Sequence, residues 1–447
     1  MKLAQCFQTL ARLRFAAWLW AMSGFAQEAA LPNTNGVYLI DLPTALQLAG
    51  ARSLDLKIAR EKLAEARANR ESSVWHFFPS VTPGVGYRRH DNLIQDTTGN
   101  IIEVHKDSYT VGPVLAAQLD LGDAIYKNLA SRQLVKAAES GLESQRQDSL
   151  LAAALGYFDL AKTQAAVAVA HEAVRIAQDF AGQLERAVEA GLAFKGDALR
   201  AQVQVEKNHL TLRQTQEQQR VAAARLVQTL HLESAVELAA REGELVPLDL
   251  VATNASLDSL VVQALSSRPE LGQSRFIVEA ARDAKKGAVY GPLIPSIGAQ
   301  VFAGGLGGGK DGTPGTFGAS EDYQFTLGWR IGPGGLFDRG RIRAADARLK
   351  MAGLSSQKLL DEVTRQVTES FVRWQSLGDQ LATAGRAVAA AQETLRLTQL
   401  RKEFGVGVVL ENIQAEQDLT RARLDLLTAI AEVNKAQYAL KKAVGNR

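Results

Sequence analysis

The sequence predicts a mainly α-helical fold with a transmembrane β-barrel portion, in which a plan of helix, strand, strand, very long helix and helix occurs twice. Three observations predict it. Two windows, 114–246 and 334–447, contain no proline, and proline inside a helix costs about 3 kcal/mol, so long uninterrupted helices fit there. Short segments beside these windows alternate apolar and polar residues. Matching positions in the two halves are separated by 213 to 216 residues.

The second window predicts a rod. Leu360, Val363 and Val367 begin an apolar stripe in steps of three and four that continues to Leu395, which is the spacing of a packed helix seam. At about 1.5 Å per residue, the whole run would reach roughly 100 Å. Long helices are expected at about 123–190, 197–232, 337–404 and 411–445.

The alternating segments predict four strands. In the last of them, Tyr323, Phe325 and Leu327 alternate with Gln324 and Thr326, the pattern of a strand with one apolar and one polar face. The strands are expected at about 81–90, 108–119, 297–303 and 322–331. The smallest outer-membrane barrels have about eight strands, so several chains would have to contribute. A soluble, half-buried sheet packed on helices is the alternative.

The constant separation predicts a duplication. The matched pairs are Pro79 and Pro295, Phe158 and Phe371, Gly191 and Gly405, and Asp197 and Glu411. The first repeat is expected at 27–232, a linker at 233–255 and the second repeat at 256–447, with a further helix at roughly 43–75.

The N-terminus predicts a secretory signal peptide at 1–26. A basic region is followed by the apolar run from Phe15 to Met22 and by the small residues Gly24 and Ala26, as in cleaved signals. Cys6, the only cysteine, lies in this segment, so no disulfide is expected after cleavage. Removing its three basic residues from the 51 in the chain leaves 48, equal to the 48 acidic residues. A nucleic-acid partner therefore gains no support.

The sequence shows no pattern for catalysis. The six histidines lack metal-ligand spacing, and the glycine series from Gly304 to Gly318 lacks the Gly-Lys-Ser/Thr ending of a phosphate loop. We therefore expect no cofactor, no metal and no enzyme activity. After the signal, no run of about 18 apolar residues is long enough to span a bilayer as a helix.

At the last strand-to-helix junction, Leu336, Phe337, Asp338 and Gly340 form a Leu-Phe-Asp-x-Gly motif. Here the chain resembles the TolC-like outer membrane efflux proteins. The resemblance implies a homotrimer with a 12-stranded barrel in the outer membrane of a Gram-negative bacterium, continuous with a periplasmic α-helical barrel. It implies a passive exit duct of a tripartite efflux or type I secretion system. The implied partners are a periplasmic adaptor protein, an inner-membrane pump of RND or ABC type, and outer-membrane lipid.

The resemblance also assigns the two helix-to-helix turns to the periplasmic tip. The residues expected to dock the adaptor are Gly191, Phe194, Lys195, Gly196, Gly405 and Val408. Asp197 and Glu411 are expected to be aperture acids or helix caps. Phe194 and Val408 stand where many members have a small residue, which suggests a more apolar adaptor contact.

Two other classes of protein remain open on the sequence. A periplasmic adaptor also carries long hairpins, but it needs β modules flanking a single central hairpin. A secreted coiled-coil structural protein would explain the helices but not the strands.

Overall fold

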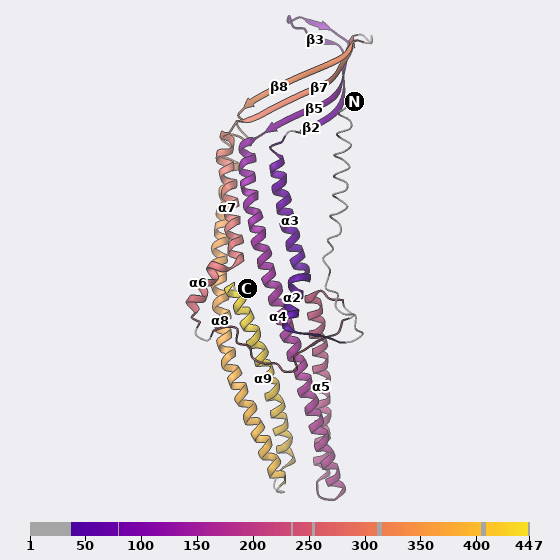
Figure 1. Ribbon diagram of the computed structural model, residues 1–447, viewed down its shortest axis with the longest axis vertical. Helices are drawn as coiled ribbons and strands as arrows, with labels where there is room; N and C mark the ends of the chain where they lie inside the picture. The colour runs from indigo at the N-terminus through magenta and orange to yellow at the C-terminus, as the bar shows by residue number, and fades with distance from the viewer. Residues whose placement is uncertain are drawn as a thin grey trace, which may run out of the picture.

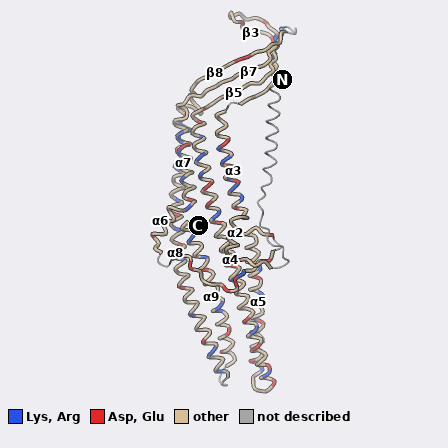
Figure 2. The backbone as a smooth tube through the Cα atoms, viewed as in Figure 1, with Lys and Arg blue, Asp and Glu red and all other residues tan. Residues whose placement is uncertain are grey.

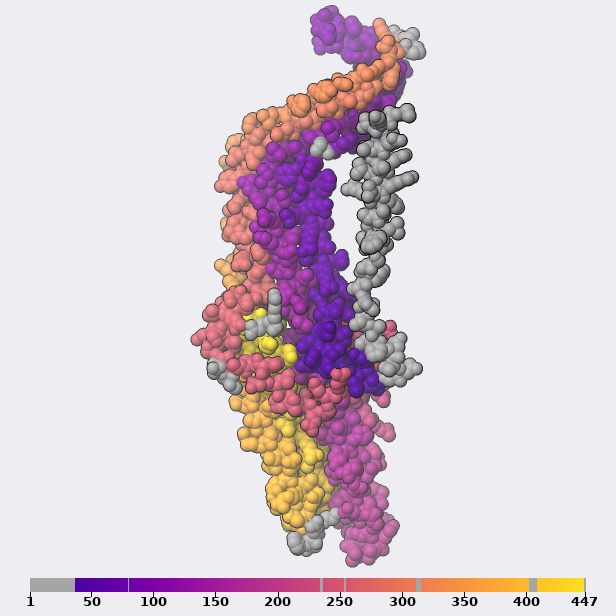
Figure 3. Space-filling view, in the orientation of Figure 1, coloured from indigo at the N-terminus to yellow at the C-terminus, as the bar shows by residue number. Residues whose placement is uncertain are grey.

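The molecule is a long helical rod with a β-sheet at one end and the ends of two helix pairs at the other (Figure 1). The computed structural model describes residues 37–78, 80–233, 236–252, 255–310, 315–403 and 408–445. The expected signal peptide at 1–26 lies outside these residues. In the space-filling view, the sheet is inclined across the end of the rod (Figure 3).

Four strands form the large sheet. They are β2 (Ser80–His90), β5 (Lys106–Leu119), β7 (Ser296–Lys310) and β8 (Phe317–Gly328). Their order is β2-β5-β7-β8, and every neighbouring pair is antiparallel. The two hairpins are thus joined through β5 and β7, although nearly 180 residues separate these strands in sequence. The sheet does not close: within the described residues, β2 and β8 each have one edge without a partner strand.

The second pair of strands differs most from the sequence prediction. β7 continues to Lys310 rather than ending near 303, and β8 begins at Phe317. Gly304, Gly305 and the glycines at 307–309 lie within β7, where neighbouring backbones approach closely. A Cβ atom on Gly304 would lie 2.3 Å from the Val111 carbonyl oxygen. Between β2 and β5, β3 (Leu93–Gln95) and β4 (Ile101–Glu103) form a short hairpin.

Two very long helices run the length of the rod. The four long helices are α4 (Leu121–Glu189), α5 (Lys195–Leu230), α8 (Arg339–Glu403) and α9 (Val409–Val444). With 69 and 65 residues, α4 and α8 each extend about 100 Å. α5 packs back along α4, and α9 packs along α8. These two helix hairpins make the half of the rod that is distant from the sheet (Figure 1).

Shorter helices complete the half of the rod next to the sheet. They are α2 (Leu42–Arg52), α3 (Leu54–Trp75), α6 (Leu257–Ser267) and α7 (Pro269–Tyr290), with the 3-10 turn η1 (Gly291–Leu293). The expected single helix at 43–75 is two helices. Ser53 interrupts it, because its side chain caps α3 by accepting from the backbone N–H of Leu56. Its hydroxyl also lies 3.1 Å from that of Ser149 on α4.

The chain between the two repeats crosses the middle of the rod and is bound there. β6 (Leu238–Ala240) pairs in parallel with β1 (Tyr38–Ile40) over a core that includes Tyr157, Leu160 and Leu230. The side-chain amide of Gln164 on α4 bonds both the N–H and the carbonyl of Ala240. The segment is therefore a structural element rather than a loose connection.

Candidate functional site

The sheet has one apolar and one polar face. The strand register places the apolar side chains of all four strands in common rows. Three of these rows are Val81-Leu115-Val301-Tyr323, Ala117-Ala299-Phe325 and Leu119-Ile297-Leu327. The opposite face has rows such as Ser80-Ala116-Gln300-Gln324 and Gln118-Gly298-Thr326.

The apolar face is open. The exposed fraction of the side chain is 80% for Val85, 66% for Tyr87 and 75% for Phe325. Few charged residues lie on the strands, whereas acidic and basic residues are spread along the helices (Figure 2). A continuous apolar face of this size is the surface that a lipid-facing sheet presents.

The last strand enters its long helix through a tight elbow, where the Leu-Phe-Asp-x-Gly motif lies. The backbone N–H of Leu336 donates to the Arg330 carbonyl at 2.8 Å. Asp338 caps α8: its carboxylate accepts from the N–H groups of Arg341 and Gly334, both at 2.9 Å. These two bonds, that of Arg341 foremost, lower the pKa of Asp338. The aspartate of the motif thus fixes the start of the helix.

Of the other motif residues, Phe337 has an unusual backbone conformation and Gly340 has an open environment. Phe337 has a φ of +67°, a left-handed conformation that non-glycine residues rarely adopt, and its ring is 80% exposed. Gly340 has room for a methyl group, since the nearest atom to an added Cβ is an Asp338 oxygen at 3.4 Å. Nothing steric requires glycine at position 340.

The junctions of the two repeats are tied to each other. Arg341 donates to the carboxylate of Asp123 at the start of α4, and Arg330 lies 3.5 Å from Asp120. Gly122 allows α4 to touch η1, because a Cβ there would lie 2.0 Å from the Gly291 carbonyl oxygen. Sequence reasoning missed these ion pairs. The one sequence feature that pointed to this junction was the run Leu-Asp-Leu-Gly-Asp at 119–123, which weakly repeats the Leu-Phe-Asp-x-Gly motif.

At the opposite end, the turn from α4 to α5 presents an apolar tip. Gly191 has a φ of +70°, and Leu192 N–H donates to the Ala187 carbonyl at 2.8 Å, as in a Schellman helix end. Phe194 is the N-cap residue of α5 and is 72% exposed. Its ring lies over Gly196, where an added Cβ would be 2.3 Å from a ring carbon. Lys195 is the exposed first residue of the helix.

The second turn is partly described. Val408 is the N-cap residue of α9 and is 56% exposed. Gly405 lies outside the described residues. The two tips together show that apolar side chains occupy both N-cap positions, so neither helix has a side-chain cap hydrogen bond.

The two tip acids are not N-cap residues. Asp197 and Glu411 each lie in the first turn of their helix, where a negative charge is favourable near the positive end of the helix dipole. Asp197 pairs with Arg200 on the same helix at 3.1 Å, whereas Glu411 pairs with Arg401 of α8 at 3.1 Å. Glu411 thus joins the two helices of its hairpin.

Two negative findings concern the described residues alone. They contain no group of three or more His, Cys, Asp or Glu side chains placed to hold a metal ion. None of the helices described combines the length and apolar character needed to cross a bilayer.

A long helical rod that continues from an antiparallel sheet with one apolar face defines the class of outer-membrane channels with a periplasmic extension. The family model of "Outer membrane efflux protein" matches residues 45–230 and again 260–446. The chain belongs to this family. It is located in the outer membrane, its helices extend into the periplasm, and the family is one of channels rather than enzymes.

Curated relatives and solved structures agree with this assignment. The chain is 24% identical over 411 residues to the solvent efflux pump outer membrane protein SrpC of Pseudomonas putida, covering 88% of this chain and 82% of SrpC. It is 26% identical over 187 residues to the outer membrane efflux protein BepC of Brucella suis, covering 41% of this chain and 39% of BepC.

The fold is also that of solved channels. A membrane protein from Pseudomonas aeruginosa superposes with a TM-score of 0.78 at 19% identity, covering 91% of this chain and 93% of that one. The channel CusC superposes with a TM-score of 0.74 at 20% identity, covering 94% of this chain and 96% of CusC.

Proposed function

We propose that three copies of the chain form a 12-stranded outer-membrane barrel that continues as a periplasmic α-helical barrel. The row-by-row alignment of apolar side chains across all four strands carries the proposal. A sheet edge in lipid leaves backbone groups without hydrogen bonds, so the edges must meet others. Because four alternating strands leave β2 and β8 antiparallel to each other, β8 of one copy can pair with β2 of the next.

The trimer is a passive exit duct. The apolar face turns to lipid, and the polar rows with Gln300, Gln324 and Thr326 turn to a water-filled interior. The energy that drives transport through the duct comes from a partner protein.

The duct serves a tripartite efflux or type I secretion system. The tips at 191–197 and 405–411 dock on a periplasmic adaptor, which couples the duct to an inner-membrane pump of RND or ABC type. Phe194 and Val408, both exposed at the N-cap positions of returning helices, supply the apolar part of this contact. We further propose repeats at 27–232 and 256–447, a linker at 233–255 and a cleaved signal at 1–26.

A cysteine ladder tests the assembly. One cysteine at Thr82 of β2 is combined in turn with one at Asp322, Gln324, Thr326 or Gly328 of β8. The sequence has a single cysteine, Cys6, which is replaced by serine throughout. After oxidation in outer membranes, at least one pair is expected to give three covalently linked chains on a denaturing gel.

The same preparation, placed in a planar lipid film, is expected to conduct ions. Failure of every β8 position to cross-link, together with an absence of conductance, would overturn the proposal.

A further inference from the structure

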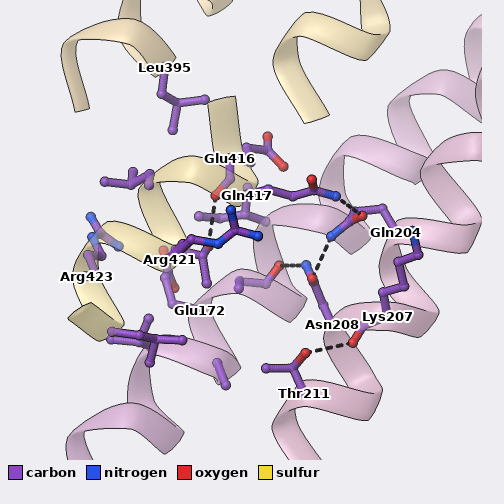
Figure 4. A pocket seen from close by; sticks show the side chains of 17 residues that line it. Glu172, Gln204, Lys207, Asn208, Thr211, Leu395, Glu416, Gln417, Arg421 and Arg423 are labelled. Carbon is purple, nitrogen blue, oxygen red and sulfur yellow. Dashed lines mark hydrogen bonds between the residues drawn. The ribbon is translucent and has the colours of Figure 1, made fainter. Parts of the chain in front are cut away.

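A pocket of about 400 Å³ lies between the two helix hairpins, in the half of the rod that ends at the tips. Its walls come from α4, α5 and α9, with Leu395 contributed by α8 (Figure 4). This volume is in the range that accommodates a small organic molecule.

A chain of side-chain amides fixes one wall of the pocket. Gln417 of α9 donates to Gln204 of α5, Gln204 donates to Asn208 at 2.8 Å, and Asn208 donates to the Ala173 carbonyl of α4 at 2.9 Å. Gln204 is only 8% exposed. These hydrogen bonds join α9, α5 and α4. Because each amide N–H₂ group already has an acceptor, the orientation of the three side chains in this wall is fixed.

Three cations line the pocket, Lys207, Arg421 and Arg423. Lys207 and Arg421 lie on either side of this amide chain (Figure 4). Lys207 is the thirteenth residue of α5 counted from Lys195, and Arg421 is the thirteenth of α9 counted from Val409. Both are exposed, and no carboxylate of the described residues lies within ion-pair distance of either. Each repeat therefore places a cation at the same position of its returning helix, and both cations line this one pocket.

Each of the two carboxylates of the pocket has a hydrogen-bond donor of its own. Glu172 accepts two hydrogen bonds from Arg175, at 2.6 and 3.0 Å, and these chiefly lower its pKa. Glu416 accepts from the side-chain amide of Asn412 at 2.9 Å. The remaining lining holds the half-buried Arg423, whose charge also contributes to lowering the pKa of Glu172, and aliphatic residues such as Ala170 and Leu419, which are buried.

We infer that this pocket binds an amphipathic organic anion, with its apolar body on the aliphatic wall and its carboxylate, sulfonate or phosphate group beside the lining cations, of which Lys207 and Arg421 are the exposed ones. The guanidinium supplies paired N–H donors and the ammonium a compact charge, which suits such a head group. The inference rests on the proposed function, because it names a class of molecule that the duct would carry. Since both cations are exposed, binding weakens as salt is added.

A pair of probes tests the charge directly. 8-Anilinonaphthalene-1-sulfonate and N-phenyl-1-naphthylamine share one ring system and differ by the sulfonate. Each is titrated by fluorescence into the full-length protein in lipid nanodiscs, with empty nanodiscs subtracted. The anionic probe is expected to bind more tightly than the neutral one. The variant Lys207→Gln with Arg421→Gln is expected to weaken the anionic probe at least tenfold and to change the neutral probe less than twofold.

Two further variants serve as controls. Arg213→Gln with Arg220→Gln removes two exposed cations of α5 that do not line the pocket, and is expected to leave both probes within twofold of the wild type. Lys207→Arg with Arg421→Lys keeps both charges and is expected to retain binding of the anionic probe. Helix content from circular dichroism shows that each variant is folded.

Three outcomes would overturn the inference. They are unchanged sulfonate binding in the glutamine pair, equal loss of both probes, and loss of an adaptor cross-link without loss of the probe. The last would assign the cations to an acidic protein partner. Conductance of the same preparations in planar lipid films tests the proposed duct independently of probe binding. A variant can fail to bind the probe and still conduct ions.

Discussion

The side-chain amide of Asn434 on α9 binds the backbone beside Leu248, in the chain that connects the two repeats. Its oxygen accepts from the Leu248 N–H at 2.7 Å, and its nitrogen donates to the Val246 carbonyl at 2.9 Å. Asn434 is fully buried. Gln437, one turn later, holds Leu250 and Leu248 in the same way. The two side-chain amides thus make the hydrogen bonds to this segment that a neighbouring strand would make.

The first prediction concerns this clamp. Asn434→Ala leaves a backbone donor and a backbone acceptor without partners, so it is expected to destabilise the protein by about 2 to 4 kcal/mol. The thermal midpoint followed by circular dichroism measures the loss. Gln414→Ala, an exposed amide on the same helix, is expected to change stability by about 0.5 kcal/mol or less. Equal midpoints for the two variants would contradict the clamp.

The second prediction concerns the contact between α4 and η1. Gly122→Ala places a methyl group against the Gly291 carbonyl, and the overpacking is expected to cost about 1 to 3 kcal/mol. Gly378→Ala, in the exposed interior of α8 with no atom within 4 Å of an added Cβ, is expected to gain about 0.5 to 1 kcal/mol through helix propensity. Relative to the wild type, the thermal midpoint is expected to fall for Gly122→Ala and to rise for Gly378→Ala. A loss at both positions, or at neither, would count against this close approach.

The third prediction is a pH dependence at the contact of α7 and α8. Hydrogen bonds from Lys285 of α7, at 2.7 Å, and from Lys350, at 2.8 Å, lower the pKa of Asp346 to about 2. A lowered carboxyl pKa stabilises the fold above the unfolded value near 4, and this stabilisation is lost as the pH falls to about 2.

Asp346→Asn is therefore expected to lower the thermal midpoint at pH 7, with the difference from wild type shrinking below pH 4 and vanishing only below about pH 2. Asp361→Asn removes an exposed acid of the same helix and is expected to show little change at any pH. A difference for Asp346→Asn that is independent of pH would exclude the ion pair as its source.

The fourth prediction concerns the tips. Phe194→Ser together with Val408→Ser removes the apolar side chains at both N-cap positions, and adaptor binding is expected to weaken at least tenfold, or by about 1.4 kcal/mol. The measurements are drug susceptibility of cells and cross-linking to the adaptor recovered with the protein. Val262→Ser changes an equally exposed aliphatic residue of α6, far from the tips, and is expected to change neither. Unaltered efflux and cross-linking in the double variant would show that the adaptor contacts other residues.

The proline-free windows and the apolar periodicity together predicted the long helices to within about two residues at each end. In α8, Val363 and Val367 of the predicted seam are fully buried. The strand faces were also readable, because Tyr323 and Phe325 lie on the face shared with Val301 and Ala299. A local sequence pattern is enough to predict the faces of a helix or strand when each face meets a single environment.

The contacts between the repeats could not be read in this way. Arg341 and Asp123 are 218 residues apart, and neither interrupts a local pattern. The pocket cations Lys207 and Arg421 look like ordinary solvated residues until the fold brings their helices together. The extent of β7 was misjudged because glycine marks both a loop and a close approach of backbones, and Gly304 serves the second purpose.

The unpaired edges of β2 and β8 set the order of events in biogenesis. A lone chain offers two rows of unmatched peptide groups beside an oily surface, so it can neither rest in the bilayer nor remain safe in water. In the proposed trimer these edges pair only between chains, so insertion into the membrane and association of the three chains are one concerted process.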